Sequence, residues 1–455
     1  MNLDPIFKAK TMAVIGVSSH NDSHPANVIY NKNHFRYPLN VYPVNPKGGT
    51  IKREILYRDI SEIPDKIDIA VIGVRADFVP GIMETCIRNN VGGAVVISGG
   101  FAESGKLDIQ KRLVDMAHEA DFPFIGPNCL GVYSPQKIDT LFLPGERLIQ
   151  PTPGNVAFVS QSGGVMVDHM VKFTRQGIGI SIATSIGNKA LIREIDMLNY
   201  LSEDTQTRVI AFYIEGFERD EGRRFLLSAE KCPKPVIVMK GGRSHAGSKT
   251  VSSHTASMAG YYQIFSDVIE QHGILEARNE MELASYCEAL SSYQRCIMGR
   301  IGIITISGGH GVVAVDHCAD LGLDVPQFTE ATKKAIRDNL SSSIQSIASL
   351  ENPIDLTGSA IDDDFLAAAN ILVKSQEVDC LLILILPYSP GISAELGARI
   401  SHICKTEDKP VIAYIPNEEK YAMLIEGFEL NGVPVSSSVE GSVLMAKALR
   451  RHEKC

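Results

Sequence analysis

Short runs of aliphatic and β-branched residues alternate with amphipathic segments along the whole chain, and this alternation constrains the fold more than any other feature. Typical runs are "TMAVIGV" (11–17), "IDIAVIGV" (67–74) and "TRVIAFYIE" (207–215). Each run ends in Gly, Ser or Pro, and a helical pattern follows. Such an order is typical of βαβ units, whose strands form parallel sheets.

The runs fall into three groups, which predict an α/β fold with three Rossmann-like or flavodoxin-like parallel-sheet domains in series. We expect the domains over residues 1–132, 153–275 and 296–455. The Pro-rich segment 132–155 lacks periodicity and is predicted to be a linker, and a helix near 276–296 should join the second and third domains. In the third domain we expect strands at "GRIGIITISGG", "GLDVP", "DCLLILILP" and "KPVIAYIP".

Composition excludes several classes of function. The chain has 455 residues and a net charge of −9, with no basic stripe, so nucleic acid is not an expected partner. Its nine cysteines are dispersed without a CxxC pair, which favours a reduced cytoplasmic location and predicts no metal site. The start of the chain does not have the pattern of a signal peptide. The most apolar stretch, "VDCLLILILPYSP", is about half the length of a membrane span. We therefore expect no membrane contact.

The first domain lacks the pattern of a nicotinamide site. One glycine, Gly16, follows its first strand where G-x-G-x-x-G would need three, and no acidic residue ends the second strand. A Ser-rich turn and Lys47 occur instead, and these suit phosphate groups. The sequence leaves open a nucleotide ligand of another kind or a domain that binds nothing.

Three strands end in Gly/Ser turns that open helices, at "ISGGFAESG" (97–105), "VSQSGGVMVDHM" (159–170) and "ISGGHGVVAVDHC" (306–318). Glycines allow an anion to approach the backbone, and helix starts present unpaired N–H groups. One such turn is commonly structural. Two turns of nearly identical form in separate domains predict a shared phosphoryl group.

His254 lies among small and hydroxyl side chains in "VSSHTASMAG", after the Gly-rich "MKGGRSHAGSKT". A neutral imidazole accepts a phosphoryl group well near pH 7, provided that its other nitrogen is oriented. Glu215, at the end of a strand, is the candidate for that orienting group. A solvated loop histidine is the alternative, and His245 and His310 are the rival carriers.

Taken together, "VSQSGG", "FYIEGF" and "SSHTASMAG" resemble the nucleoside-diphosphate-forming acyl-CoA synthetases, which include succinyl-CoA synthetase. "NPKGG", "ISGGFAE" and "IGPNCLG" are similar to the coenzyme A domain of that family. The third domain, with "NPIDLTGS", resembles the corresponding domain of the ADP-forming acetyl-CoA synthetases. The resemblance covers nearly the whole chain and is closest to an alpha subunit of the acetyl type. Gln161, where succinyl-CoA synthetases often carry Arg, favours the acetyl-type branch over a succinate enzyme.

The resemblance implies a role for individual residues. His254 would be phosphorylated and Glu215 would hold it, whereas Arg243 and Lys249 are either helpers for the phosphoryl charge or simple surface charges. The two phosphate-binding helix starts would consist of Ser160, Ser162, Gly163, Gly164, Gly308, Gly309 and Gly311. The coenzyme A positions would be Gly16, Ser18, Pro46, Lys47, Val74, Ser98, Asn128 and Cys129. The Cys129 thiol itself has no base beside it in the sequence and is interpreted as a small buried thiol.

The resemblance also implies the reaction and the partners. Acyl-CoA and phosphate would give an acyl phosphate and coenzyme A; the phosphoryl group would pass to His254 and then to ADP, giving ATP, a substrate-level phosphorylation. No segment resembles an ATP-grasp domain, so ADP, ATP and Mg²⁺ are expected on a beta subunit in an α2β2 heterotetramer. A Gly/Ser-rich loop over 242–260 would have to move between two sites.

Two other functions remain open at this stage. A non-catalytic CoA-sensing or interaction protein could use the same scaffold, although it need not keep both Glu215 and His254. A regulator of protein acylation would need an acetyltransferase segment, and no such segment is recognised in the sequence.

Overall fold

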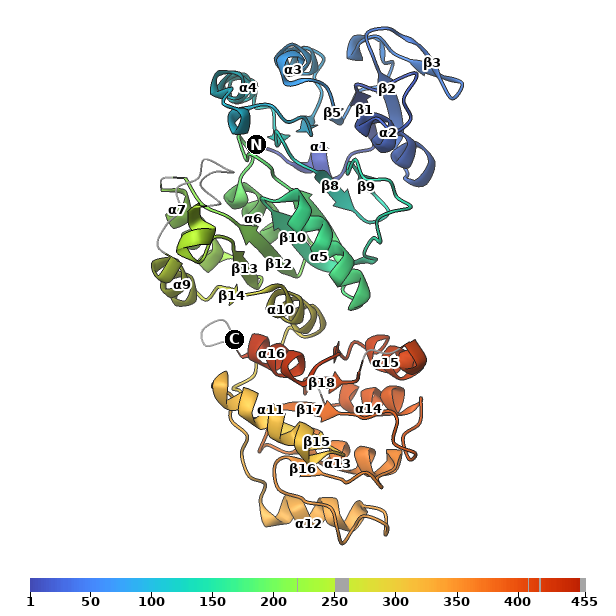
Figure 1. Cartoon of the computed structure of the whole chain (residues 1–455), viewed down its shortest axis with the longest axis vertical. Helices are drawn as coiled ribbons and strands as arrows, with labels where there is room; N and C mark the ends of the chain where they lie inside the picture. Colours follow the sequence, from blue (N-terminus) through green and yellow to red (C-terminus); the bar gives the residue numbers. More distant parts are fainter. Residues whose placement is uncertain (219, 250–261, 408, 417–418, 451–455) are drawn as a thin grey trace. The chain divides into compact units, whose positions relative to one another are not determined.

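The computed structural model describes residues 1–218, 220–249, 262–407, 409–416 and 419–450, and it contains two compact units (Figure 1). The first unit is Met1–Arg278 and holds two large sheets; the second is Asn279–Cys455 and holds one. The predicted α/β class with parallel sheets in series is confirmed. None of the described helices is long and apolar enough to cross a membrane.

The first sheet has the strand order β2-β1-β5-β6-β7, and all its pairs are parallel. Strands β5 and β6 are buried at every residue, which explains their unbroken apolar sequence. A hairpin of two further strands follows β2. The strands are β1 (Thr11–Ile15), β2 (Asn40–Val44), β3 (Gly49–Ile51), β4 (Glu54–Leu56), β5 (Ile69–Ile72), β6 (Gly93–Val96) and β7 (Phe124–Ile125). The helices are α1 (Asp4–Phe7), α2 (Pro25–Arg36), α3 (Val79–Arg88) and α4 (Leu107–Ala120).

The second sheet has the order β14-β13-β12-β10-β11-β8-β9. Its strands are β8 (Gly131–Ser134), β9 (Ile138–Asp139), β10 (Pro153–Ser160), β11 (Ile180–Ser185), β12 (Val209–Ile214), β13 (Val236–Lys240) and β14 (Leu275–Ala277). The helices are α5 (Gly163–Arg175), α6 (Glu194–Glu203), α7 (Glu221–Lys231) and α9 (Tyr262–Gln271).

The prediction that residues 132–155 form only a linker is wrong. Strand β8 pairs antiparallel with β11, and β9 pairs antiparallel with β8, so this segment extends the second sheet. Both strands are buried at every residue and very short. A period of two residues cannot show in strands of this length, which is why the sequence pattern missed them.

The second unit has a parallel sheet with the order β16-β15-β17-β18-β19. Its strands are β15 (Ile301–Thr305), β16 (Ile354–Asp355), β17 (Cys380–Leu384), β18 (Val411–Tyr414) and β19 (Val435–Ser436). Its helices are α10 (Glu280–Ser292), α11 (Gly308–Asp320), α12 (Glu330–Asn339), α13 (Asp362–Lys374), α14 (Leu396–Lys405), α15 (Ala422–Glu429) and α16 (Val439–Leu449). The expected joining helix, α10, belongs to this unit, where Tyr293 after its end donates a 2.8 Å hydrogen bond to the carbonyl of Val411.

The expected strand "GLDVP" (322–326) is wrong, because only Asp324 makes an isolated bridge, to Arg300. Gly322 has a φ of +69°, and Pro326 has no N–H to donate to a neighbouring strand. The edge of the sheet is instead β16, within the "NPIDL" stretch.

A buried ion pair joins the first sheet's helix α2 to strand β9 of the second sheet. The Lys32 ammonium lies 2.9 Å from an Asp139 carboxylate oxygen, with both side chains almost fully buried. Asn33 adds two hydrogen bonds to the main chain of Asp139, at 2.7 and 3.0 Å. The Gln150 amide donates to the second carboxylate oxygen at 2.7 Å. The two sheets of the first unit are therefore joined by a satisfied polar contact.

We predict that Lys32→Met lowers the free energy of unfolding of the first unit by about 3–5 kcal/mol, because Asp139 keeps a buried charge without its cation. Urea unfolding followed by circular dichroism measures the change. Lys111→Met, which breaks an exposed pair with Asp115, is the control and should cost less than about 1 kcal/mol. Equal effects of the two substitutions would contradict this role for Lys32.

Candidate functional site

The turn between β10 and α5 presents the start of a helix. The Ser160 hydroxyl donates to the carbonyl of Ser162 at 2.6 Å and accepts from its N–H at 3.1 Å. The Ser162 hydroxyl then caps α5 by accepting from the N–H of Val165. A Cβ on Gly163 would lie 3.0 Å from that of Leu130, whereas Gly164 borders open space. The exposed N–H groups and the helix dipole give this turn the character of an anion site.

Glu215 lies beside this turn because β12 pairs in parallel with β10. Ser160 is opposite Tyr213 in the register, and the N–H of Gln161 donates to the carbonyl of Tyr213 at 3.2 Å. Glu215 therefore follows its strand at the edge where α5 begins. Burial, with the neighbouring Glu215 carboxylate, raises the pKa of Tyr213 to about 12.

The Gln161 side chain holds the main chain on both sides of the Glu215–Gly216 peptide. Its carbonyl accepts from the N–H of Glu215 at 2.6 Å and from that of Gly216 at 3.2 Å. Its amide donates to the carbonyl of Gly216 at 2.9 Å and to the carboxylate of Glu194. Because Gln161 is buried, these contacts are made without competition from water.

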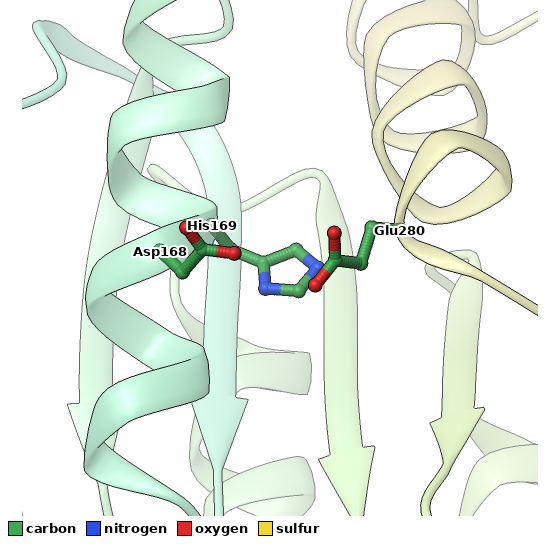
Figure 2. Close-up of side chains that lie close together, drawn as sticks. All are labelled: Asp168, His169 and Glu280. Atoms are coloured by element: carbon green, nitrogen blue, oxygen red, sulfur yellow. The ribbon is translucent and has the colours of Figure 1, made fainter.

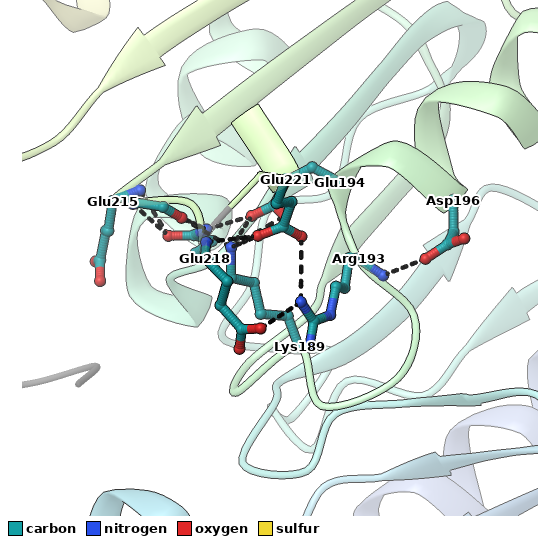
Figure 3. A network of polar contacts seen from close by, with 9 residues as sticks. Lys189, Arg193, Glu194, Asp196, Glu215, Glu218 and Glu221 are labelled. Atoms are coloured by element: carbon teal, nitrogen blue, oxygen red, sulfur yellow. Dashed lines mark hydrogen bonds and ion pairs between the residues drawn. The ribbon is translucent and has the colours of Figure 1, made fainter. Parts of the chain in front are cut away.

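Behind this peptide lies a buried ion cluster that the sequence analysis missed. The Lys189 ammonium lies 3.2 Å from carboxylate oxygens of Glu194 and Glu221, and it donates to the carbonyl of Gly216 at 2.7 Å. All three charged side chains are at least nine-tenths buried (Figure 3). Burial raises the pKa of Glu194, and Lys189 opposes that shift. The one available sequence signal was a lysine in the "SIGNKA" turn, directly after a fully buried strand.

Lys240, at the end of β13, touches Glu215 from the other side. Its ammonium donates to the carbonyl of Glu215 at 2.7 Å and to that of Gly241. Burial lowers its pKa to about 8, and Glu215 partly offsets this shift. Glu215 thus has its N–H fixed by the buried Gln161 side chain and its C=O fixed by the half-buried Lys240 side chain.

The predicted phosphoryl carrier, His254, lies outside the described residues, as does the rest of 250–261. The expected movement of the loop 242–260 falls largely on these positions. Of the neighbouring charges, Arg243 stacks on Tyr262, with its guanidinium 5.7 Å from the ring centre. The rival His310 lies in the second unit, with Nδ1 3.0 Å from the hydroxyl of Ser307.

His169 is a buried histidine of another kind. Figure 2 shows it on α5 beside Asp168, and it is fully buried. Its Nδ1 lies 2.8 Å from the carbonyl of Val165, and its ring centre is 5.1 Å from that of Phe158. This histidine is therefore a core residue of the second sheet.

The second predicted helix start, at α11, repeats the turn of α5. Thr305 and Ser307 exchange the same two hydrogen bonds, at 3.2 and 3.1 Å. Gly308 and Gly309 are exposed at the first turn, as an anion site requires. Gly311 is buried, and a Cβ there would lie 3.2 Å from that of Pro353, so this glycine allows close packing rather than exposure to a ligand.

Three of the expected coenzyme A residues line one cavity of about 560 Å³ at the carboxyl ends of the strands of the first sheet. They are Gly16, Pro46 and Val74. Gly16 has a φ of +103°, and a Cβ there would lie 2.4 Å from the carbonyl oxygen of Gly73. Only glycine fits this approach. Arg75 and Phe78 line the same cavity, which offers a cation and an aromatic face.

The other expected coenzyme A residues, Ser18, Lys47, Ser98, Asn128 and Cys129, are not among the residues that line this cavity. The Ser98 hydroxyl accepts from the N–H of Val74 at 3.1 Å, and the Ser98 carbonyl accepts from the N–H of Asn128. Lys47 is exposed, and the N–H of Ser18 donates to Asn27. Cys129 is buried, its thiol contacts the carbonyl of Val96, and burial raises its pKa to about 12. Its interpretation as a small buried thiol is confirmed.

Comparisons with known proteins match two stretches of the chain separately. Residues 10–135 match the family described as "CoA binding domain", and residues 153–290 match "Succinyl-CoA ligase like flavodoxin domain". The chain is 32% identical over 466 residues to the alpha subunit of acetate–CoA ligase [ADP-forming] I from Pyrococcus furiosus, covering 100% of this chain and 98% of that one.

A longer relative and a solved structure extend the match. Acetate–CoA ligase [ADP-forming] I from Archaeoglobus fulgidus is 36% identical over 390 residues, which cover 85% of this chain and 55% of that protein, so the chain spans about half of its length. The dinucleotide-forming acetyl-coenzyme A synthetase 1 of Candidatus Korarchaeum cryptofilum, in complex with phosphate and ADP, matches with a TM-score of 0.90 and 30% identity. That match covers 98% of this chain and 96% of the other.

The shifted pKa of Lys240 predicts a dependence of stability on pH. Folding lowers this pKa from 10.5 to about 8. Between these values the unfolded chain binds the proton and the folded chain does not, so stability rises with pH in that window. We predict that the difference in unfolding free energy between wild type and Lys240→Met increases from pH 8 to pH 10. Urea unfolding at each pH measures it, with Lys111→Met as the exposed control. A difference that stays constant across this range would refute the shift.

Proposed function

Because the chain belongs to the family of ADP-forming acetate–CoA ligase alpha subunits, we propose that it carries the phosphoryl-transfer centre of an acid–thiol ligase. The reaction interconverts acyl-CoA, ADP and phosphate with an organic acid, coenzyme A and ATP. The observation that carries this proposal is the exposed start of α5 beside Glu215, whose main chain is held by Gln161 and Lys240.

In the first step, phosphate attacks the thioester carbonyl and displaces the thiolate of coenzyme A, which leaves an acyl phosphate. In the second, an imidazole nitrogen of His254 attacks the phosphorus atom and the carboxylate of the acid leaves. The Glu215 carboxylate accepts the N–H of the other ring nitrogen and stabilises the positive charge that forms there. The start of α5 stabilises the phosphoryl oxygens.

The third step transfers the phosphoryl group from His254 to ADP. We assign ADP and Mg²⁺ to a partner subunit with an ATP-grasp domain and propose an α2β2 assembly. The 55% coverage of the longer Archaeoglobus relative supports a second component, since that single chain holds further sequence beyond the matched part. We further propose that the loop over 242–260 carries His254 between the two centres, and that the enzyme works in the cytoplasm.

Coenzyme A is proposed to occupy the 560 Å³ cavity beside Gly16, Pro46 and Val74. The match of residues 10–135 to a CoA binding domain supports this assignment. The cavity's apolar wall and its arginines, Arg58 and Arg75, suit a ligand with an aromatic base and phosphate groups.

Labelling tests the carrier. We predict that the chain, purified with its partner and incubated with ATP labelled on the γ-phosphate, gains an acid-labile, base-stable label. His254→Ala should abolish the label, and Glu215→Gln should slow its formation by about 10²-fold or more, because the imidazole loses the negative charge that stabilises its cationic form. His245→Ala is the matched control and should label normally. A label that persists in His254→Ala would place the carrier elsewhere. An unlabelled wild-type complex that still binds coenzyme A would favour the CoA-sensing alternative.

Filling the cavity tests the coenzyme A site. We predict that Val74→Phe raises the KM for acyl-CoA about 10-fold or more, because the added ring occupies space that the ligand needs. The labelling of His254 from ATP should be unchanged. Ile55→Phe, at an exposed position of β4, is the control. An unaltered KM in Val74→Phe would exclude this cavity as the coenzyme A site.

A further inference from the structure

The turn Ile186–Ala190, directly after β11, lies between two parts of the first unit. On one side, the N–H of Asn188 donates to the carbonyl of Pro127 at 2.9 Å, and the N–H of Ala190 donates to that of Gly126 at 3.1 Å. On the other side, Lys189 reaches the carbonyl of Gly216. Neighbouring residues of one turn thus contact the loop after β7 and the loop after β12.

The Asn188 side chain binds the turn to segments that follow strands β6 and β7 at the carboxyl edge of the first sheet. Its amide donates to the Glu103 carboxylate at 2.5 Å and to Gln110 at 3.0 Å, and its carbonyl accepts from Asn128 at 3.2 Å. A Cβ on Gly187 would lie 2.4 Å from the carbonyl oxygens of Pro127 and Asn128, so the turn packs directly against that loop. The same edge carries the residues assigned above to coenzyme A.

Lys189 has a left-handed backbone, with a φ of +44°. This region favours glycine or asparagine, so a lysine there is not explained by backbone preference. Its ammonium instead binds three buried groups, from Glu194, Gly216 and Glu221. The backbone strain is consistent with a residue selected for what its side chain holds.

Lys189 and Gln161 together hold the main chain of Glu215 and Gly216. Lys189 and Gln161 both donate to the carbonyl of Gly216, at 2.7 and 2.9 Å, and Gln161 also accepts the N–H groups of Glu215 and Gly216. Glu194 in turn accepts from both Lys189 and Gln161. The cluster therefore surrounds the main chain of these two residues (Figure 3).

We propose that Lys189 and Gln161 are the positioning residues of the phosphoryl-transfer centre: they fix the peptide that carries Glu215, and through Asn188 they hold it in register with the coenzyme A edge. This inference rests on the proposed function. A displacement of about 1 Å in such a group is sufficient to lower a rate about 10²-fold.

The main test uses the double variant Lys189→Met with Glu194→Gln, which deletes one positive and one negative charge together. In the complex with the partner subunit, labelling from ATP should slow about 10²-fold, while the KM for acyl-CoA stays within about twofold. The matched control is Lys172→Met with Asp168→Asn, an ion pair on the exposed side of α5. It should label at the wild-type rate.

A cycle with Glu215→Gln separates positioning from a general structural effect. If Lys189 acts through Glu215, adding Lys189→Met and Glu194→Gln to Glu215→Gln should slow labelling by less than about threefold. The effects of residues that act as a unit are not additive. Should the double variant fail to fold by circular dichroism, Gln161→Met replaces it with the same expectations.

The outcomes distinguish the two proposals. If the wild type is labelled and the folded double variant is labelled at the same rate, the positioning role is overturned and the proposed function is not. Full additivity with Glu215→Gln, or a KM for acyl-CoA that rises as much as labelling falls, would also overturn it. An unlabelled wild-type complex would instead refute the proposed function.

Discussion

The parallel pairing of β10 with β12 is the constraint from which the rest of the site follows. It places Ser160 opposite Tyr213, so the residues after both strands emerge at the same edge of the sheet. One strand leads into the start of α5, and the other leads to Glu215. A helix dipole and a carboxylate thereby become neighbours, although more than fifty positions separate them in the chain. Parallel sheets gather binding groups at this edge as a rule.

The same turn occurs at three helix starts, but its surroundings differ. Hydroxyls at Ser160, Thr305 and Ser436 each accept the N–H two positions later and donate to that residue's carbonyl. Such a turn orders the entry to a helix and does not define a function. What distinguishes the first is the buried amide of Gln161, which follows Ser160 and engages the next loop of the same edge. Chemistry at this turn therefore depends on its neighbours.

Much of this arrangement could be predicted from sequence, and the failures have physical causes. Long apolar strands such as "IDIAVIGV", and the Gly/Ser turns, carry their signal locally, so the fold class, Glu215 and the helix starts could be recognised. Strands β8 and β16 are too short to show a period, and Pro326 with Gly322 removes the strand expected at "GLDVP". The Lys189 cluster depends on groups from the turn after β11, the loop after β12 and the first residues of α6 and α7, and only tertiary structure brings them together.

The Lys189 cluster consists of charged side chains although it is buried, and this requires a physical reason. Two buried carboxylates and one lysine are costly to desolvate, and apolar side chains of similar volume often stabilise a protein equally well. Apolar side chains, however, cannot form hydrogen bonds with main-chain carbonyl and N–H groups. Lys189 and Gln161 provide directional contacts to the main chain of Glu215 and Gly216, and Glu194 and Glu221 fix the lysine in turn. The cost of burial is therefore best understood as the cost of a fixed position for Glu215, rather than as a contribution to stability.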